Sequence, residues 1–586
     1  MKKRIVVLGL IMCLILTACS KDTGSKESTE SVETSGTAEE NQHASTSTVM
    51  LEEGEYNEEE LDDSWSEENA TTIHLTGDSA DIDGSGVTTS GSAISISSAG
   101  TYVLSGELSD GRIIVNVTEG GVRLVLNGVS ITSMDFAAID IQQGDTIITL
   151  ADGTINSVSD SEAEAENIER NNAAIYAKDD LVFNGTGSLQ VVGSYKNAIQ
   201  CKDKLKFISG TYNISASNHG LVGKDCIMIR NGEFTITSGS DGMQATNIEE
   251  SDKGYIIIDG GSFDIISGTD GIQAETLLRI NAGDYNIVSG GGSGAAEQSS
   301  ENEGMPGEGR RGGGPGGSDQ MDMDETTEDT ASTKGLKSYV DLVIADGELS
   351  IDACDDAVHS NDTVTVNGGS LMISTGDDGL HADNELVIND GAITIDTSYE
   401  GLEGYTVTIN GGNIDLKATD DGINAAQASS ETNGKEPRMG ESQGAVLEIN
   451  GGEINVNASG DGIDANGQIT VCGGTLTVQG PVMGGNGTFD FDEDLIITGG
   501  SILSVGTPSM AQTASADSTQ GFITGTFDST IAVGTTLTVS DESGNELLSF
   551  ETEKESSWFM FSASELEKGS SYTVSAGDIE MAVTAE

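Results

Sequence analysis

Residues 379–400 read GLHADNELVINDGAITIDTSYE, and residues 401–421 follow at once with GLEGYTVTINGGNIDLKATDD. The two blocks superpose residue on residue, with Gly391 over Gly412. A repeat of about 22 residues is typical of a solenoid, in which each repeat forms one structural unit that stacks on the next. One block therefore predicts one coil.

Within a block the apolar residues alternate with polar ones. Val407 and Ile409 alternate with threonines, Gly411 and Gly412 turn the chain, and the alternation resumes over residues 413–416. This period of two predicts strand, tight turn and strand. A single coil cannot bury its apolar side alone, whereas parallel stacking at about 4.8 Å completes both the hydrogen bonds and the core. The sequence therefore predicts an all-β fold, a right-handed parallel β-helix with about 22 residues per coil.

Residues 1–18 have the pattern of a lipoprotein signal peptide. Three basic residues precede an apolar run that is too short to span a bilayer, and Leu-Thr-Ala stands ahead of Cys19. This ending resembles a bacterial lipobox, which implies cleavage before Cys19 and a lipid on its thiol. A secretory signal without lipid, cut nearby, is the alternative. We expect an extracellular protein that is lipid-anchored to the bacterial cell membrane.

Composition shifts divide the rest of the chain. Residues 19–69 are acidic and poor in apolar side chains, which predicts a disordered tether. Residues 70–173 alternate without a clean repeat, so we expect an N-terminal β region of first, irregular coils, with a small β cap as the alternative. Residues 174–504 carry the regular coils, interrupted by a low-complexity insertion at 290–334. Residues 521–586 predict a small antiparallel C-terminal cap that covers the open strand edge.

The bulk charge limits the partners. The chain has 97 acidic and 26 basic residues, a formal net charge of −71. Such a protein repels nucleic acid and anionic lipid surfaces, so its partners are expected to be neutral, cationic or bridged by metal. We expect a monomer that meets the membrane only through its N-terminal lipid.

The cysteines downstream of Cys19 are Cys201, Cys226, Cys354 and Cys472. Their positions in the coil frame predict free, mostly buried thiols and no disulfide framework.

Stacking turns each repeat position into a column along the axis. The column after the apolar residues of the second strand contains Asn367, Asn389, Asn410 and Asn450. Amides stacked at strand spacing predict a hydrogen-bonded ladder.

A second column, here named the acid column, lies just before the glycine that starts each coil. Its members are Asp241, Asp270, Asp356, Asp378, Glu400, Asp421 and Asp461. Asp-Gly is ordinary turn chemistry, so one interpretation is that each aspartate caps its own corner. Carboxylates about 5 Å apart repel one another, however, and oxygen ligands are those that Ca²⁺ prefers. We therefore predict bound Ca²⁺ on this edge, at a cluster of Asp355, Asp356, Asp377, Asp378, Asp420 and Asp421, with Asp461 next.

A third column, here named the polar row, is the x of the repeated G-[ILM]-x-A. Its neighbours on both sides face inward, so x faces outward beside the acid column. The row is expected to bind substrate through Tyr176, Gln200, Gln244, Gln273, His359, His381, Glu403 and Asn424. A polysaccharide whose sugars recur at about 5 Å could follow this row. The alternative is a solvated sheet face without a ligand.

His359 and His381 stack one coil apart in the polar row. Together with Asp356 or Asp378 they could bind a transition metal, because imidazole and carboxylate suit such ions. Two solvated histidines that are neighbours by coincidence are the alternative.

Repeats of the types G-I-x-A, INGG and DDG run through the chain. Other distinctive stretches are GTYVLSGELSDGRIIVNV at 100–117, VRLVLNGVSIT at 122–132, the Gly-rich acidic insertion and TLTVSDESGNELLSFETE at 536–553. Together these resemble the bacterial carbohydrate-binding-domain proteins, over nearly everything from about Ala70 to Ala576. The resemblance implies a secreted right-handed β-helix, similar in fold to pectate lyases, that binds cellulose and acidic plant polysaccharides and carries Ca²⁺.

The predicted function is polysaccharide binding without turnover, assisted by Ca²⁺, on cellulose or a pectin-like plant glycan. A Ca²⁺-dependent polysaccharide lyase is one alternative, but it needs a basic side chain beside the bound uronate. Arg230 and Arg279 are expected on different faces, and Lys337 and Lys417 are isolated. A non-catalytic surface adhesin or scaffold is the other alternative.

Overall fold

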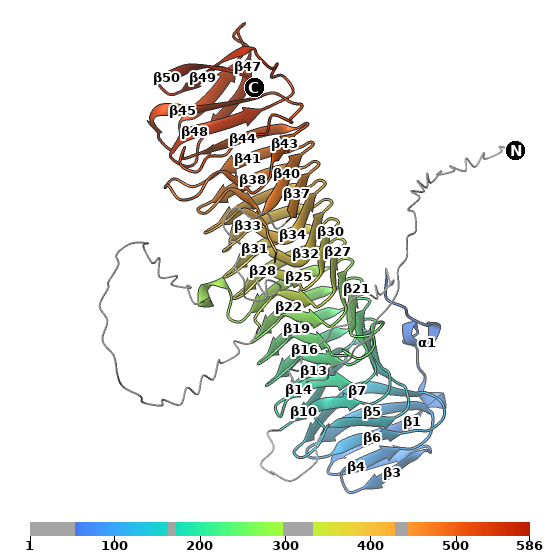
Figure 1. Ribbon diagram of the computed structural model, residues 1–586. Helices are drawn as coiled ribbons and strands as arrows, with labels where there is room; N and C mark the ends of the chain where they lie inside the picture. Colours follow the sequence, from blue (N-terminus) through green and yellow to red (C-terminus); the bar gives the residue numbers. More distant parts are fainter. Residues whose placement is uncertain (1–52, 162–170, 297–331, 428–443) are drawn as a thin grey trace, which may run out of the picture. The chain divides into compact units, whose positions relative to one another are not determined.

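A computed structural model of the chain describes residues 53–161, 171–296, 332–427 and 444–586 (Figure 1). The signal peptide expected over residues 1–18, the lipidation site Cys19 and most of the insertion lie outside these residues. Three short helical segments occur among strands: α1 (Glu58–Leu61), η1 (Glu67–Asn69) and η2 (Ser293–Ala295). In this part of the chain no helix is long and apolar enough to cross a membrane.

The strands stack into three parallel ladders, and each complete coil contributes one strand to each ladder (Figure 1). The coil of β26 (Leu336–Ser338), β27 (Asp341–Ile344) and β28 (Glu348–Ala353) pairs in register with the coil of β29 (Val358–Ser360), β30 (Thr363–Val366) and β31 (Ser370–Thr375). The predicted all-β solenoid, a parallel β-helix, is therefore confirmed.

The first ladder carries the polar row. It contains β4 (Ala93–Ile96), β6 (Arg112–Asn116), β8 (Ile139–Gln143), β11 (Ala173–Ala177), β14 (Asn197–Cys201), β17 (Leu221–Gly223), β20 (Met243–Ala245), β23 (Ile272–Ala274), β26, β29, the starts of β32 (Leu380–Ile388) and β34 (Leu402–Ile409), β36 (Ile423–Ala425), β39 (Ile463–Ala465) and β42 (Phe489–Phe491).

The second ladder contains β1 (Thr71–Gly77), β5 (Gly100–Leu108), β7 (Val122–Ser133), β9 (Thr146–Leu150), β12 (Leu181–Gly185), β15 (Lys204–Phe207), β18 (Cys226–Ile229), β21 (Tyr255–Ile258), β24 (Leu277–Ile280), β27, β30, the ends of β32 and β34, β37 (Ala445–Ile449), β40 (Gly467–Val471) and β43 (Leu495–Ile497).

The third ladder contains β10 (Ile155–Asp160), β13 (Ser188–Gly193), β16 (Thr211–Ala216), β19 (Glu233–Ser238), β22 (Ser262–Ser267), β25 (Asp284–Ser289), β28, β31, β33 (Ala392–Thr397), β35 (Asn413–Ala418), β38 (Glu453–Ala458), β41 (Thr475–Gln479) and β44 (Ser501–Gly506).

Both ends of the stack use antiparallel strands. At the N-terminal end β2 (Ala80–Asp83) pairs with β1, and β3 (Val87–Ser90) pairs with β4. At the C-terminal end β44 pairs with β48 (Ser556–Ser562), which pairs with β45 (Phe522–Ile531). A separate sheet of β47 (Glu546–Glu551), β46 (Thr536–Ser540), β49 (Ser571–Ala576) and β50 (Ile579–Thr584) completes the predicted antiparallel cap.

An aromatic stack fills part of the interior. Tyr212, Phe234, Phe263 and Tyr285 occupy the same position on successive coils of the third ladder. Their ring centroids lie 4.8, 5.0 and 4.7 Å apart along the stack, with nearly parallel planes. Stacking at strand spacing thus adds ring contacts to apolar burial.

The predicted amide ladder is confirmed on the outside. Asn450 donates to Asn410 at 3.0 Å, Asn410 to Asn389 at 2.8 Å and Asn389 to Asn367 at 2.8 Å. The four expected thiols are also free, with Cys201 and Cys226 buried, Cys354 half-buried and Cys472 exposed.

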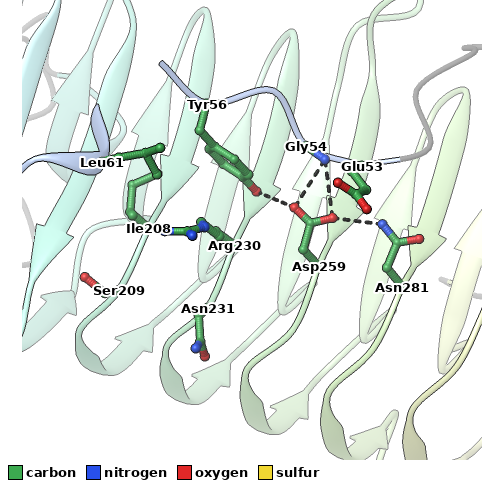
Figure 2. A pocket seen from close by; sticks show the side chains of 10 residues that line it. All are labelled: Glu53, Gly54, Tyr56, Leu61, Ile208, Ser209, Arg230, Asn231, Asp259 and Asn281. Carbon is green, nitrogen blue, oxygen red and sulfur yellow. Dashed lines mark hydrogen bonds between the residues drawn. The ribbon is translucent and has the colours of Figure 1, made fainter. Parts of the chain in front are cut away.

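Residues 53–69, here named the N-terminal strap, pack on the second ladder, which differs from the tether expected over residues 19–69. Glu60 forms a buried ion pair with Lys206, Nζ to Oε1 at 2.9 Å. The Tyr56 hydroxyl donates to Asp259 at 3.0 Å, beside a groove of about 630 Å³ (Figure 2). Glutamate-rich composition predicted disorder, but a few side chains anchor the strap.

The strap covers apolar side chains that point out of the solenoid. Tyr56 packs against a cluster of Cys226, Met228, Tyr255, Ile257 and Leu277. Trp65 packs against a second cluster of Val103, Val125 and Ala151. Removing this surface from water stabilises the strap in place.

Replacing Phe234 by alanine removes a buried ring from the middle of the aromatic stack. We expect a loss of about 3–5 kcal/mol in stability, because the transfer and cavity terms add. Thermal unfolding followed by circular dichroism measures it. The matched control is Thr235→Ala, whose side chain is exposed on the same strand. Equal melting temperatures for the two variants would contradict the stack.

Glu60→Gln leaves the Lys206 ammonium buried without its counter-charge. We expect the strap to detach more often, since breaking a buried ion pair on one side costs about 3–5 kcal/mol. Faster proteolytic cleavage within residues 53–69 is the readout. Glu59→Gln, at an exposed neighbour, should leave the cleavage rate unchanged.

Candidate functional site

The acid column lies where successive coils enter the first ladder, and its members are linked by hydrogen bonds. The backbone N–H of Asp378 donates to Asp356 Oδ1 at 3.1 Å, and that of Glu400 donates to Asp378 Oδ1 at 3.1 Å. Asp461 N–H donates to Asp421 Oδ1 at 2.5 Å. The predicted alignment is therefore confirmed. These carboxylates cap the next coil's corner, whereas capping of their own corner was one expectation.

The N-terminal part of the acid column is neutralised by basic side chains. His219 Nδ1 lies 3.1 Å from Asp241 Oδ2, and Lys337 Nζ lies 3.6 Å from Asp270 Oδ2. Lys334 Nζ lies 2.6 Å from Asp356 Oδ2. Each of these carboxylates thus has a cationic or protonatable partner.

The predicted Asp355–Asp356–Asp377 cluster does come together, with ligand atoms within 4.8 Å of one another. Lys334 enters it, however, because its Nζ also lies 2.9 Å from Asp355 Oδ1. Burial, followed by the charges of Asp378, Asp356 and Asp355, raises the pKa of Asp377 to about 7. The cluster therefore already holds one positive charge.

Lys334 is a residue that sequence reasoning missed, although a signal was present. It directly precedes Gly335 and so occupies the acid-column position of its coil. Because it ends the long insertion, its place in the column was not recognised.

The C-terminal part of the acid column has no such partner. Glu400, Asp421 and Asp461 of the acid column, and Asp464 of the neighbouring polar row, form no ion pair with lysine or arginine within the described residues. Burial raises the pKa of Asp421 to about 8, with further increases from Asp420 and Asp461. Burial and the charge of Asp461 raise the pKa of Asp464 to about 7. This run of carboxylates is under mutual repulsion.

Glu400 and Glu403 extend the same run. Burial comes first in raising the pKa of both, and the Asp378 charge raises both further; Glu403 also feels Glu400 and the opposing charge of His381. Asn424 Nδ2 donates to Glu400 Oε2 at 2.9 Å, whereas its buried Oδ1 has no hydrogen-bond partner among the described residues. Asn424 Oδ1 and the Glu400 carboxylate are oxygen donors, the type of ligand that Ca²⁺ takes.

The polar row is continuous. Register pairs join its positions from Tyr176 to Asp464, one strand of the first ladder to the next. Most of the row is nevertheless shielded: Tyr176, Gln200, Gln273, His359 and Asn424 are less than one-tenth exposed, while Gln244, His381 and Glu403 are half-buried.

This burial contradicts the solvated face of the alternative, but it does not test that alternative's lack of a ligand. Most strands of the first ladder are only three residues long. Gln200 Oε1 is buried in the row without a hydrogen-bond partner among the described residues. Most of the polar row is thus shielded from solvent.

His381 is the main positive charge opposite the C-terminal carboxylates. Burial alone lowers its pKa, but the hydrogen bonds to Asp378 and Asp383 and the charges of Glu403 and Asp356 raise it to about 11. Its Nδ1 lies 3.1 Å from Glu403 Oε2. The imidazole is thus held by carboxylates on several sides.

Comparison with known proteins gives three similarities. A family model described as "Carbohydrate-binding domain-containing protein" matches residues 90–379 and 377–586. A protein of that description from Acetivibrio thermocellus is 36% identical over 136 residues, 22% of this chain and 48% of the relative. The chain thus spans about half the length of this curated relative. A solved structure, the gadolinium derivative of a polysaccharide lyase-like protein from C. thermocellum, is 33% identical over 37% of this chain and 89% of the other, with a TM-score of 0.35.

The raised carboxylate pKa values predict how stability depends on pH. A carboxyl whose folded pKa lies above its unfolded value of about 4 stabilises the fold at low pH, and this stability is lost as pH rises through the folded pKa. Without divalent cations, we expect the melting temperature to fall between about pH 5 and pH 9, where Asp421 and Asp464 ionise. Excess Ca²⁺ should reduce this fall in melting temperature.

Glu400→Gln combined with Asp421→Asn tests the origin of this dependence. In EDTA, the melting temperature of the double variant should fall less as pH rises, because two mutually repelling charges are gone. The control is Asp415→Asn with Glu453→Gln, which removes two exposed charges from the third ladder. An equal change in both double variants would contradict the assignment to the acid column.

Proposed function

Because the chain belongs to the family of carbohydrate-binding domain-containing proteins, we propose that it binds a polysaccharide with the help of Ca²⁺ held on the C-terminal part of the acid column. The observation that carries this is a set of shielded carboxylates, Glu400, Asp421 and Asp464, that form no ion pair among the described residues, together with the orphaned oxygen of Asn424. These three carboxylates would hold the ion together with Asn424. When bound, Ca²⁺ supplies positive charge to an anionic sugar.

The ligand class follows from charge. A protein of net charge −71 repels a pectin-like chain of uronates, so such a chain needs a bridging cation. Cellulose carries no charge and needs no bridge. We therefore propose that uronate binding depends on Ca²⁺ and that cellulose binding, where it occurs, does not.

The burial of the polar row also limits how a glycan makes contact. Gln273 and Asn424 expose little surface. A sugar chain would meet bound ions and the half-buried Gln244, His381 and Glu403 first. This assigns the row a supporting role.

We propose binding without turnover. The lyase alternative needs a neutral base beside the ion, yet the charges of Asp356 and Asp355 outweigh burial and raise the pKa of Lys334. Arg230 lines the groove under the strap, where Asp259 and Asn281 also lie (Figure 2). Neither side chain is therefore a suitable base. Through the lipid expected on Cys19, the protein would display this surface outside the cell.

Pull-down with insoluble pectate, cellulose and xylan, in Ca²⁺ and in EDTA, tests the proposal. Retention on pectate in Ca²⁺ alone is expected, without ultraviolet-absorbing unsaturated products. Glu400→Gln with Asp421→Asn should weaken retention by about tenfold or more, because the charge of the ligand set sets Ca²⁺ affinity.

The matched control for the pull-down is Asp415→Asn with Glu453→Gln, which should bind as the native protein does. Product release would establish a lyase instead. Failure to bind any of the three glycans would favour the adhesin or scaffold.

A further inference from the structure

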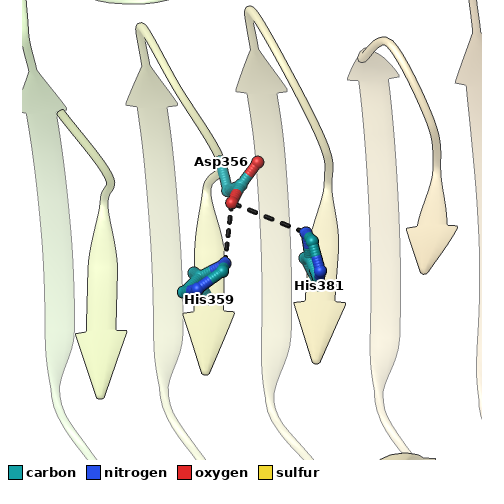
Figure 3. A group of neighbouring side chains, drawn as sticks. All are labelled: Asp356, His359 and His381. Carbon is teal, nitrogen blue, oxygen red and sulfur yellow. Dashed lines mark ion pairs between the residues drawn. The ribbon is translucent and has the colours of Figure 1, made fainter. Parts of the chain in front are cut away.

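Two histidines of the polar row meet one acid-column carboxylate, Asp356 (Figure 3). His359 on β29 and His381 on β32 are register partners, with ring centroids 4.8 Å apart and planes inclined at 70°. His359 is only 8% exposed. His359 is therefore not a solvated side chain.

The distances suit a shared cation. Asp356 Oδ2 lies 2.8 Å from His359 Nδ1 and 3.8 Å from His381 Nδ1, and the three ligand atoms lie within 4.8 Å of one another. Two ligands bonded tetrahedrally at about 2.1 Å are about 3.4 Å apart, a separation within this range.

His359 Nδ1 provides an independent observation. It is buried and forms no hydrogen bond of acceptable geometry among the described residues, although Asp356 lies close. A ring nitrogen with no proton shared along the contact is free to donate its lone pair to a metal.

His381 can bind a metal through Nδ1 when its imidazolium releases a proton, as metal ligands do on binding. Its other nitrogen, Nε2, lies 3.3 Å from Asp383 Oδ1. A carboxylate behind a histidine fixes the tautomer and orientation of a metal ligand. On the Nδ1 side, Asp378 Oδ2 at 3.3 Å and Glu403 Oε2 at 3.1 Å offer further oxygens.

We propose that Asp356, His359 and His381 form a binding site for a transition-metal dication such as Zn²⁺, separate from the oxygen-only Ca²⁺ site. Imidazole nitrogen favours Zn²⁺ and its neighbours in the series, whereas Ca²⁺ takes oxygen ligands. Glu403 or water completes the ligand set. Lys334, which shares Asp356 Oδ2, keeps its second partner Asp355 when the metal binds.

Calorimetric titration of the full-length protein with Zn²⁺, in excess Ca²⁺, tests the site. Saturable binding is expected in the native protein. His359→Gln with His381→Gln should weaken it by about 100-fold or more, and Asp383→Asn by about tenfold, as for the loss of a supporting carboxylate.

The matched control is His219→Gln. His219 forms the same kind of contact with an acid-column aspartate, Nδ1 to Asp241 Oδ2 at 3.1 Å, but its coil has Val222 in the polar row in place of a second histidine. This variant keeps the exposed thiol of Cys472, so binding to that thiol is unchanged. Zn²⁺ affinity should equal that of the native protein.

Co²⁺ provides a second readout, because its visible absorption reports a nitrogen- and oxygen-ligated site directly. The native spectrum should be lost in the histidine double variant and kept in His219→Gln. Melting temperatures in EDTA establish that the variants are folded, and the single His359→Gln variant replaces the double one where folding fails. Native-like Zn²⁺ affinity in the histidine variants, or no saturable binding by the native protein, would overturn the proposal.

Discussion

The rest of the structure depends on parallel, in-register hydrogen bonding between successive coils. This pairing places equivalent residues of successive coils about 4.8 Å apart. Each side chain therefore lies next to the side chain at the same repeat position of the next coil. Apolar and aromatic side chains gain contacts from such repetition, as Phe234 and Phe263 do at 5.0 Å. Amides gain hydrogen bonds, as Asn389 and Asn410 do. Carboxylates, in contrast, repel one another when they are stacked. Their column is therefore the one in which a binding partner of opposite charge is expected.

The acid column resolves this repulsion differently along its length. Two unit charges about 5 Å apart repel by about 0.8 kcal/mol in water and about 3 kcal/mol at an effective dielectric of 20. Lys334 replaces an acid within the column and pairs with Asp356, which removes that cost locally. From Glu400 to Asp461 only acids occupy the position, and shielding raises the pKa values of Glu400 and Asp421 instead of an ion pair lowering them. The column is thus paired with basic side chains at one end and lacks them at the other, although the backbone repeat is uniform.

The sequence predicted the features that depend on the local repeat. It missed those that depend on which residues other parts of the chain bury. Alternation and the 22-residue repeat establish strands, coils and columns because both are properties of neighbouring residues. The outward direction of the polar row was also predictable, but its burial was not, since burial depends on residues outside the row. The strap was missed for a related reason. Its glutamate-rich composition predicts a solvated chain, whereas contacts such as that of Glu60 with Lys206 lie far apart in sequence.

The same reasoning changes which aspartates suit a hard cation. Asp355, Asp356 and Asp377 formed the most promising predicted cluster because they are doubled along the chain, and their ligand atoms do converge. Convergence without free charge is not enough, however: Lys334 pairs with two of them, and the adjacent histidines add nitrogen donors. The mixed donor set favours softer ions there, while the oxygen-only set around Asn424 suits Ca²⁺. Substituting a few side chains in one column can therefore give neighbouring coils different metal preferences without any change in the backbone.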